Sequence, residues 1–94
     1  MGKPEGRVEN YLVDKCKEHG FLCFKFVSPG RRGVPDRIVI GNGRTVFIEL
    51  KAPEGKPSEL QKLTIRQMRA VGADVRICYS RQQIDEFFKE FSDE

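Results

Sequence analysis

Residues 33–51 read GVPDRIVIGNGRTVFIELK, and the architecture of this chain can be built outward from them. Two apolar runs, 37–40 and 45–51, flank the tetrapeptide GNGR at 41–44. Asn and Gly adopt positive φ at little cost, so this tetrapeptide predicts a tight hairpin turn between two antiparallel strands. If the pairing is centred on that turn, residues whose numbers sum to about 85 lie opposite each other.

That register brings two carboxylates together. Pro35 fixes its own φ and Gly33 allows a sharp turn, so the loop delivers Asp36 at the start of the first strand. Asp36 is then expected to face Glu49 on the second strand. Side chains alternate along a strand, so Lys51 shares the face of Glu49. Two opposed carboxylates destabilise a sheet unless a cation lies between them, and a divalent ion, the Lys51 ammonium, or both can supply that charge.

This set of groups favours one kind of chemistry. Carboxylate oxygens without His or Cys favour Mg²⁺ or Mn²⁺ over zinc, and the carbonyl of Leu50 can add a ligand. Such an ion keeps several waters, one of which can attack the phosphorus of a phosphodiester. Lys51 can orient that water, help deprotonate it, or stabilise the transition state. The residues therefore favour a Mg²⁺- or Mn²⁺-dependent nuclease with no small-molecule cofactor, in which Asp36 and Glu49 bind the metal.

The rest of the chain predicts two more strands and three helices. The strands are expected at 21–27 and 73–79, and the helices at 5–19, from Ser58 to Gly72, and from Ser80 onward. Ser58 with Gln61, and Ser80 with Gln83, resemble capping boxes that open the last two helices. The expected inward positions, helix by helix, are Val8, Leu12, Cys16 and His19; Leu60, Leu63, Thr64, Gln67, Met68 and Val71; and Ile84, Phe87, Phe88 and Phe91.

The predicted order is αβββαβ with an added C-terminal helix, which gives an α/β fold with a small mixed sheet flanked by helices. The first three strands can form an antiparallel meander, and the fourth, reached through a helix, can lie parallel to a neighbour. We expect a single domain over residues 1–94, because the chain is too short for two cores. A domain this small exposes much of its surface, so a homodimer would stabilise it.

Composition and charge limit the location and the partners. Residues 85–94 hold five acids and one lysine, a net charge of −4, so residues 1–84 carry 16 basic and 9 acidic groups, or +7. A basic body with an acidic tail is typical of a nucleic-acid-binding protein. The three cysteines have no zinc-like spacing, and no apolar run approaches the ~20 residues of a membrane span. We expect a cytoplasmic protein with no membrane partner.

The motifs Pro35-Asp36 and Glu49-Leu50-Lys51, in this order of elements, resemble the PD-(D/E)xK nuclease superfamily. The resemblance covers essentially the whole chain and implies a restriction-endonuclease-like core. Within that superfamily, the form Gly33-x-Pro35-Asp36, the helical Glu9 and the downstream Gln61 resemble the VRR-NUC (virus-type replication-repair nuclease) family.

The family resemblance implies two further site residues and a substrate. Glu9 would join Asp36 and Glu49 at the metal, and Gln61 would lie among the catalytic groups. Without the family, Glu9 reads as a solvated glutamate and Gln61 as the capping partner of Ser58. Stand-alone members occur in phages and bacteria, cut structured DNA and resemble dimeric Holliday-junction resolvases. We therefore expect a homodimer acting on branched DNA in a bacterial or phage-infected cytoplasm.

Basic residues near the predicted site are candidates for binding phosphate. Arg31 and Arg32 precede Asp36 in an exposed loop, and Lys25 and Arg37 lie on the flanking strands. The lysines and arginines of the second helix extend this surface or simply form its solvent side. Three alternatives remain open: a nuclease with flap, nicked or RNA targets, a non-catalytic DNA-binding subunit on the same fold, and a protein-interaction module.

Overall fold

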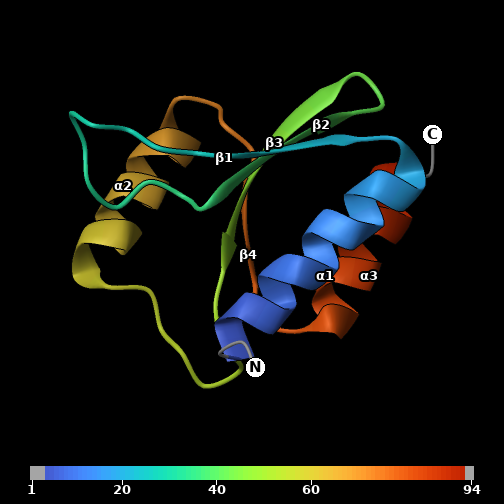
Figure 1. The fold of residues 1–94 in the computed structure, drawn as a ribbon. Coiled ribbons are helices and arrows are strands. Elements are labelled where there is room, and N and C mark those ends of the chain that lie inside the picture. The colour runs from blue at the N-terminus through green and yellow to red at the C-terminus, as the bar shows by residue number, and fades with distance from the viewer. Residues whose placement is uncertain (1–3, 93–94) are drawn as a thin grey trace.

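In the computed structural model, which describes residues 4–92, one four-stranded sheet is flanked by three helices (Figure 1). The elements are α1 (Pro4–His19), β1 (Leu22–Lys25), β2 (Arg37–Gly41), β3 (Arg44–Leu50), α2 (Glu59–Ala70), β4 (Val75–Cys78) and α3 (Arg81–Ser92). This is the order that the sequence predicts, and it confirms the α/β fold. None of the helices within residues 4–92 is long and apolar enough to cross a membrane.

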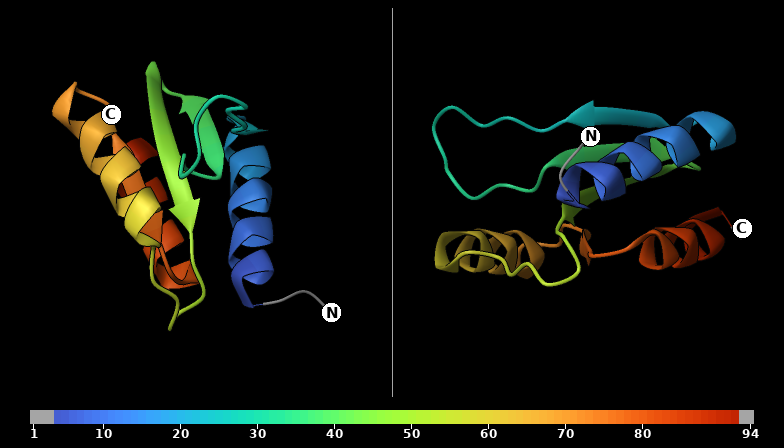
Figure 2. Two further views of the ribbon diagram at one scale, coloured as in Figure 1. Left: turned by 90° about the vertical axis from the view of Figure 1, so that its left-hand side faces the viewer. Right: turned by 60° about the horizontal axis from the view of Figure 1, so that its bottom comes forward.

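The sheet is mixed and has the strand order β1-β2-β3-β4. β1, β2 and β3 pair antiparallel, whereas β4 pairs parallel to β3, because α2 carries the chain back to the starting end of the sheet. Helices α1 and α3 pack against each other on one face, and α2 lies on the other face, towards β4 (Figures 1 and 2). The second face is therefore only partly covered.

The core lies between the sheet and the α1–α3 layer. Every second residue of β3 is buried there, at Val46, Ile48 and Leu50. The helices contribute the apolar positions that periodicity predicts, namely Val8, Leu12 and Cys16 from α1 and Ile84, Phe87, Phe88 and Phe91 from α3. His19 is the exception: it lies exposed in the last turn of α1, where its ring stacks on Phe88 at 4.7 Å between centroids.

The inward face of α2 differs from the prediction. Its buried residues are Thr64 and Ile65, whereas Leu60 and Leu63 are about two-fifths exposed and Val71 is 87% exposed. Gln67 is exposed as well. Thr64 lies inward as expected and donates a hydrogen bond to the 26–36 loop. The helix is nevertheless rotated from the expected phase, because Ile65 is buried and Gln61 faces inward to donate a hydrogen bond to β3. Apolar periodicity alone therefore selects the wrong face.

The hairpin register follows the prediction. Arg37 pairs with Ile48 and Gly41 pairs with Arg44, so opposed residues sum to 85. Asn42 has a φ of 55° and Gly43 a φ of 74°, the positive values that a two-residue hairpin turn requires. One step beyond Arg37, this register places Asp36 opposite Glu49.

The loop that leads into β2 lies against α2 through Gly33. Its φ of 82° is in the left-handed region, and a Cβ atom there would lie 2.9 Å from both the Leu60 carbonyl oxygen and the Thr64 hydroxyl. Glycine at this position thus allows both the turn and the close contact between the loop and α2. The adjoining Pro35 is buried.

We expect Gly33→Ala to destabilise the protein by about 2–5 kcal/mol, combining about 1–2 kcal/mol for a left-handed residue with about 1–3 kcal/mol for overpacking. Gly20→Ala is the matched control, because Gly20 also has a positive φ of 72° but has no atom within 4 Å of the added carbon. Urea unfolding of both variants measures the difference. Equal losses would show that the loop does not pack on α2 as described.

Candidate active site

Glu49 is the most buried charged residue of the described structure. Its side chain, from β3, is 1% exposed. One carboxylate oxygen, Oε2, forms an ion pair with the Lys51 ammonium at 3.0 Å and accepts a hydrogen bond from the Gln61 amide at 2.9 Å. A carboxylate removed from water is tolerated only with such partners, and Lys51 shares its face because the two residues are two apart on one strand.

Gln61 fulfils both roles that its sequence position allows. Its backbone N–H donates to the Ser58 hydroxyl at 3.1 Å, and its side-chain oxygen accepts from the Ser58 N–H at 2.9 Å, which completes a capping box at the start of α2. Its remaining amide group donates to Glu49. The cap therefore orients the amide towards the buried acid.

At α3 the second cap differs slightly from the prediction, since Gln83 accepts a hydrogen bond from the N–H of Tyr79 and not from that of Ser80.

Asp36 is held at the sheet end by the backbone of β3. Its Oδ2 accepts a hydrogen bond from the Leu50 N–H at 2.9 Å. The N–H groups of Phe47 and Lys51 point the other way and donate to the carbonyls of Asp74, just before β4, and of Cys78, at its end. Backbone groups alternate sides along a strand, so both the N–H and the carbonyl of Leu50 lie on the side of Asp36.

Asp36, Glu49 and the Leu50 carbonyl together provide oxygen donors that suit Mg²⁺ or Mn²⁺. The donor set has two carboxylates and no nitrogen or sulfur, and Glu49 is largely shielded from water. Within residues 4–92, no group of three or more Asp, Glu, His or Cys side chains is gathered closely enough to hold a metal. The residues present thus fit a hydrated ion bound by two carboxylates and a carbonyl.

The expected third carboxylate is not part of this group. Glu9 pairs instead with Arg37, whose Nε donates to Glu9 Oε2 at 2.7 Å in a largely buried contact between α1 and β2. Arg37 pairs with Ile48 in the sheet, so alternation directs its side chain to the α1 face, away from the face of Glu49. Glu9 could join the metal ligands only if this ion pair broke.

Cys23 adjoins the same ion pair, which the sequence did not predict. A hydrogen bond with the Cys16 thiol, together with the nearby Arg37 guanidinium, lowers the pKa of Cys23 to about 7. Arg37 thus contacts Glu9 and stabilises negative charge on Cys23. These contacts give it a structural role, and its expected binding to phosphate would have to compete with them.

The other predicted phosphate-binding residues lie on the loop and on β1. Arg31 donates to the side-chain oxygen of Gln67 and, at 3.5 Å, to the Thr64 hydroxyl. Thr64 in turn donates to the Arg32 carbonyl at 3.2 Å, so α2 fixes the course of this loop. The side chains of Arg32 and Lys25 are exposed. The sequence predicted Thr64 and Gln67 only as inward-facing residues of α2, and it did not indicate these hydrogen bonds to the loop.

Comparisons with known proteins agree with this geometry. A family model described as the VRR-NUC domain matches residues 2–82. A protein of Acyrthosiphon pisum secondary endosymbiont phage 1, named "Putative nuclease p44", is 42% identical over 78 residues, which make up 82% of this chain and 84% of the phage protein. A solved structure described as a "VRR_NUC domain" is similar with a TM-score of 0.88 and 30% identity, covering 96% of this chain and 99% of that chain.

An αβββαβ fold with Pro-Asp at the start of one strand and Glu-x-Lys at the end of the next defines a nuclease of the PD-(D/E)xK class. Within that class, the chain belongs to the VRR-NUC family.

We expect Lys51→Met to destabilise the protein by about 3–5 kcal/mol, because it leaves the Glu49 carboxylate buried without its cation. Adding Glu49→Gln to that variant should recover part of the loss, since the charge is then gone. Lys62→Met is the matched control: Lys62 pairs with Glu59 on the exposed surface of α2, where an ion pair contributes less than about 1 kcal/mol. Urea unfolding in EDTA measures these three variants and Glu49→Gln alone. A double variant that loses as much stability as Lys51→Met and Glu49→Gln lose together would contradict the pairing.

Proposed function

We propose that this nuclease hydrolyses phosphodiester bonds in branched DNA, with four-way junctions as the preferred substrate, as a homodimer that requires Mg²⁺ or Mn²⁺. The observation that carries the proposal is the buried Glu49 carboxylate, held by Lys51 and Gln61 at the end of the sheet where Asp36 begins β2. A buried acid beside a lysine and a second acid is costly for stability alone, and a metal-dependent hydrolase uses such an arrangement.

Each residue has a role that follows from its contacts. Asp36, Glu49 and the Leu50 carbonyl would hold the ion, which when bound neutralises phosphate charge and lowers the pKa of water. Lys51, 3.0 Å from Glu49, orients the attacking water or stabilises charge on the scissile phosphate. Gln61 keeps the Glu49 carboxylate in one orientation, so its effect on the rate is through that ligand.

Recognition would rest on the shape and phosphates of the substrate. Arg32 and Lys25 are exposed near the start of β2 and can contact the backbone. Neither α1 nor α3 is free to enter a groove, because each packs against the sheet. We place this activity in the cytoplasm of a bacterium or of a phage-infected cell.

The homodimer is supported by apolar side chains that the fold leaves exposed. β1 is an edge strand, and Leu22 and Phe24 are half-exposed on the face that α2 covers only in part. Val27, just beyond β1, is 73% exposed. By contrast, the phenylalanines of α3 are buried. A two-fold dimer would present two sites to a two-fold junction, so paired cuts would follow.

Cleavage of an end-labelled four-way junction, beside linear duplex and a splayed arm, tests the proposal. We expect symmetric cuts in Mg²⁺ or Mn²⁺, none in EDTA, and a loss of more than about 100-fold in Glu49→Gln, since losing even a residue that supports a metal ligand costs 10–100-fold. Glu54→Gln, an exposed acid of the same charge in the 51–58 loop, should cut like the wild type.

Three results would contradict parts of the proposal. Cutting of the splayed arm alone would contradict the preference for four-way junctions. Cutting that persists in EDTA would contradict the requirement for a metal ion. Tight binding without cutting in either metal would indicate a non-catalytic DNA-binding subunit.

A further inference from the structure

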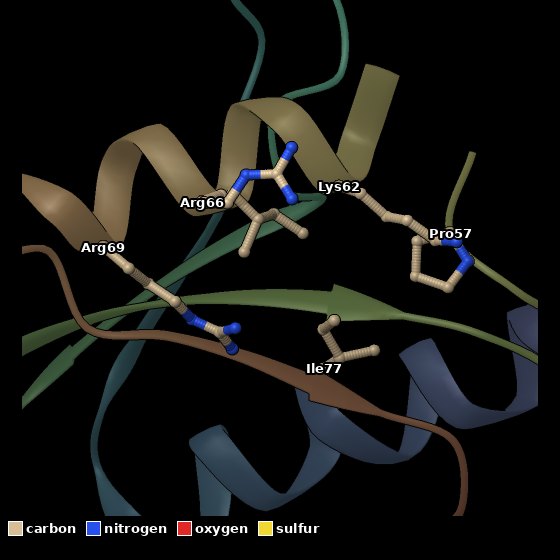
Figure 3. A pocket seen from close by; sticks show the side chains of 6 residues that line it. Pro57, Lys62, Arg66, Arg69 and Ile77 are labelled. Carbon is tan, nitrogen blue, oxygen red and sulfur yellow. The ribbon is translucent and has the colours of Figure 1, made fainter. Parts of the chain in front are cut away.

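A hollow of about 300 Å³ lies between α2 and the edge strand β4 (Figure 3). Its floor is apolar, formed by Pro57, Ile65 and Ile77. Its rim carries the cations of Lys62, Arg66 and Arg69, and no acidic side chain lines it. We call these six residues the α2–β4 groove.

The three cations follow one line along the helix. Lys62, Arg66 and Arg69 are spaced i, i+4 and i+7, so at 100° per residue they lie within about 60° of one another. At 1.5 Å per residue the line is about 10 Å long, with steps of about 6 Å and 4.5 Å between neighbouring cations. A line of cations of this length suits a polyanionic nucleic-acid backbone.

The partners of these cations leave the groove positively charged. Arg69 is fixed in place by its bonds to the Val75 carbonyl, from Nε at 3.1 Å and Nη2 at 2.5 Å, and that oxygen carries no net charge. Lys62 pairs with Glu59, but both are well exposed, so the pair is weak. Within residues 4–92, Arg66 has no ion-pair or hydrogen-bond partner.

The groove also adjoins the candidate active site. Lys62 directly follows Gln61, the residue that bonds Glu49, so the line of cations starts beside the buried acid. The Arg31 anchors, Thr64 and Gln67, lie on the opposite flank of α2. α2 therefore separates the arginine loop from a second cationic surface that the activity as proposed does not use.

We propose that the α2–β4 groove binds the sugar–phosphate backbone of the DNA substrate outside the scissile phosphate. The cations contact phosphates, and the apolar floor takes the deoxyribose faces. This inference rests on the proposed function for the identity of the ligand. It does not depend on catalysis, because a polyanionic backbone is attracted whether or not the strand is cut.

The test compares two charge-matched double variants in EDTA, so that no cutting occurs. Lys62→Gln/Arg66→Gln removes two groove cations and leaves Arg69, with its bonds to β4, in place. Lys17→Gln/Lys89→Gln removes two exposed lysines on α1 and α3, on the other face of the sheet. Binding of a fluorescent four-way junction is measured between 50 and 200 mM salt.

We expect the slope of log K against log salt to shrink by about 1.8 in the groove variant, or about 0.9 for each lost phosphate contact, and to stay unchanged in the control. The charge-preserving variant Lys62→Arg/Arg66→Lys should restore the wild-type slope.

Equal slopes in the groove and control variants would overturn the inference, whatever the cleavage result. If the wild type does not cut DNA but the salt slope still falls in the groove variant, the proposed function is wrong and the inference that the groove binds DNA is supported. A fluorescent poly-glutamate peptide serves as a second probe: groove-dependent binding of that peptide, with unchanged DNA slopes, would indicate an acidic protein partner and contradict DNA as the ligand.

Discussion

The burial of one carboxylate is the constraint on which this structure depends. Glu49 is 1% exposed, and a charge removed from water to that degree requires compensation by several groups at once. Lys51 supplies charge from the same strand, and Gln61 supplies a hydrogen bond from α2. Because Gln61 also caps that helix, the start of α2 cannot shift without exposing or unpairing the acid. The position of α2 and the pairing of Glu49 therefore depend on each other.

The strand register brings the second acid to the same place. The two-residue turn fixes the pairing of β2 with β3, and the bond from the Leu50 N–H fixes the carboxylate of Asp36 at the strand end. Both acids are thus positioned by regular structure, and the loop that precedes Asp36 is itself held against α2 through Gly33. A cation bound as proposed would find these ligands already in place, which would favour hydrolysis at a fixed phosphate.

Local sequence rules predict part of this structure well. The turn residues predict the β2–β3 register, and apolar periodicity predicts the buried faces of α1 and α3, because both signals act over a few residues. The face of α2 was predicted only in part: Thr64 lies inward as expected, whereas Gln61 faces inward to make a hydrogen bond that hydrophobicity does not encode. The pairing of Glu9 with Arg37 joins residues 28 apart in the chain, and no local pattern indicates it. The exposure of Leu22 and Phe24 on β1 likewise depends on which parts of the sheet the helices cover, and no local pattern indicates it.

Mn²⁺ binding, followed by electron paramagnetic resonance on the wild type and on single-residue variants, tests the metal site most directly. Asp36→Asn and Glu49→Gln should each weaken binding by at least about tenfold, because each removes a charged ligand. Glu54→Gln should bind as the wild type does, since Glu54 lies exposed in a loop. Equal Mn²⁺ binding by the wild type and by the Asp36 and Glu49 variants would contradict the assignment of these two carboxylates as the metal ligands.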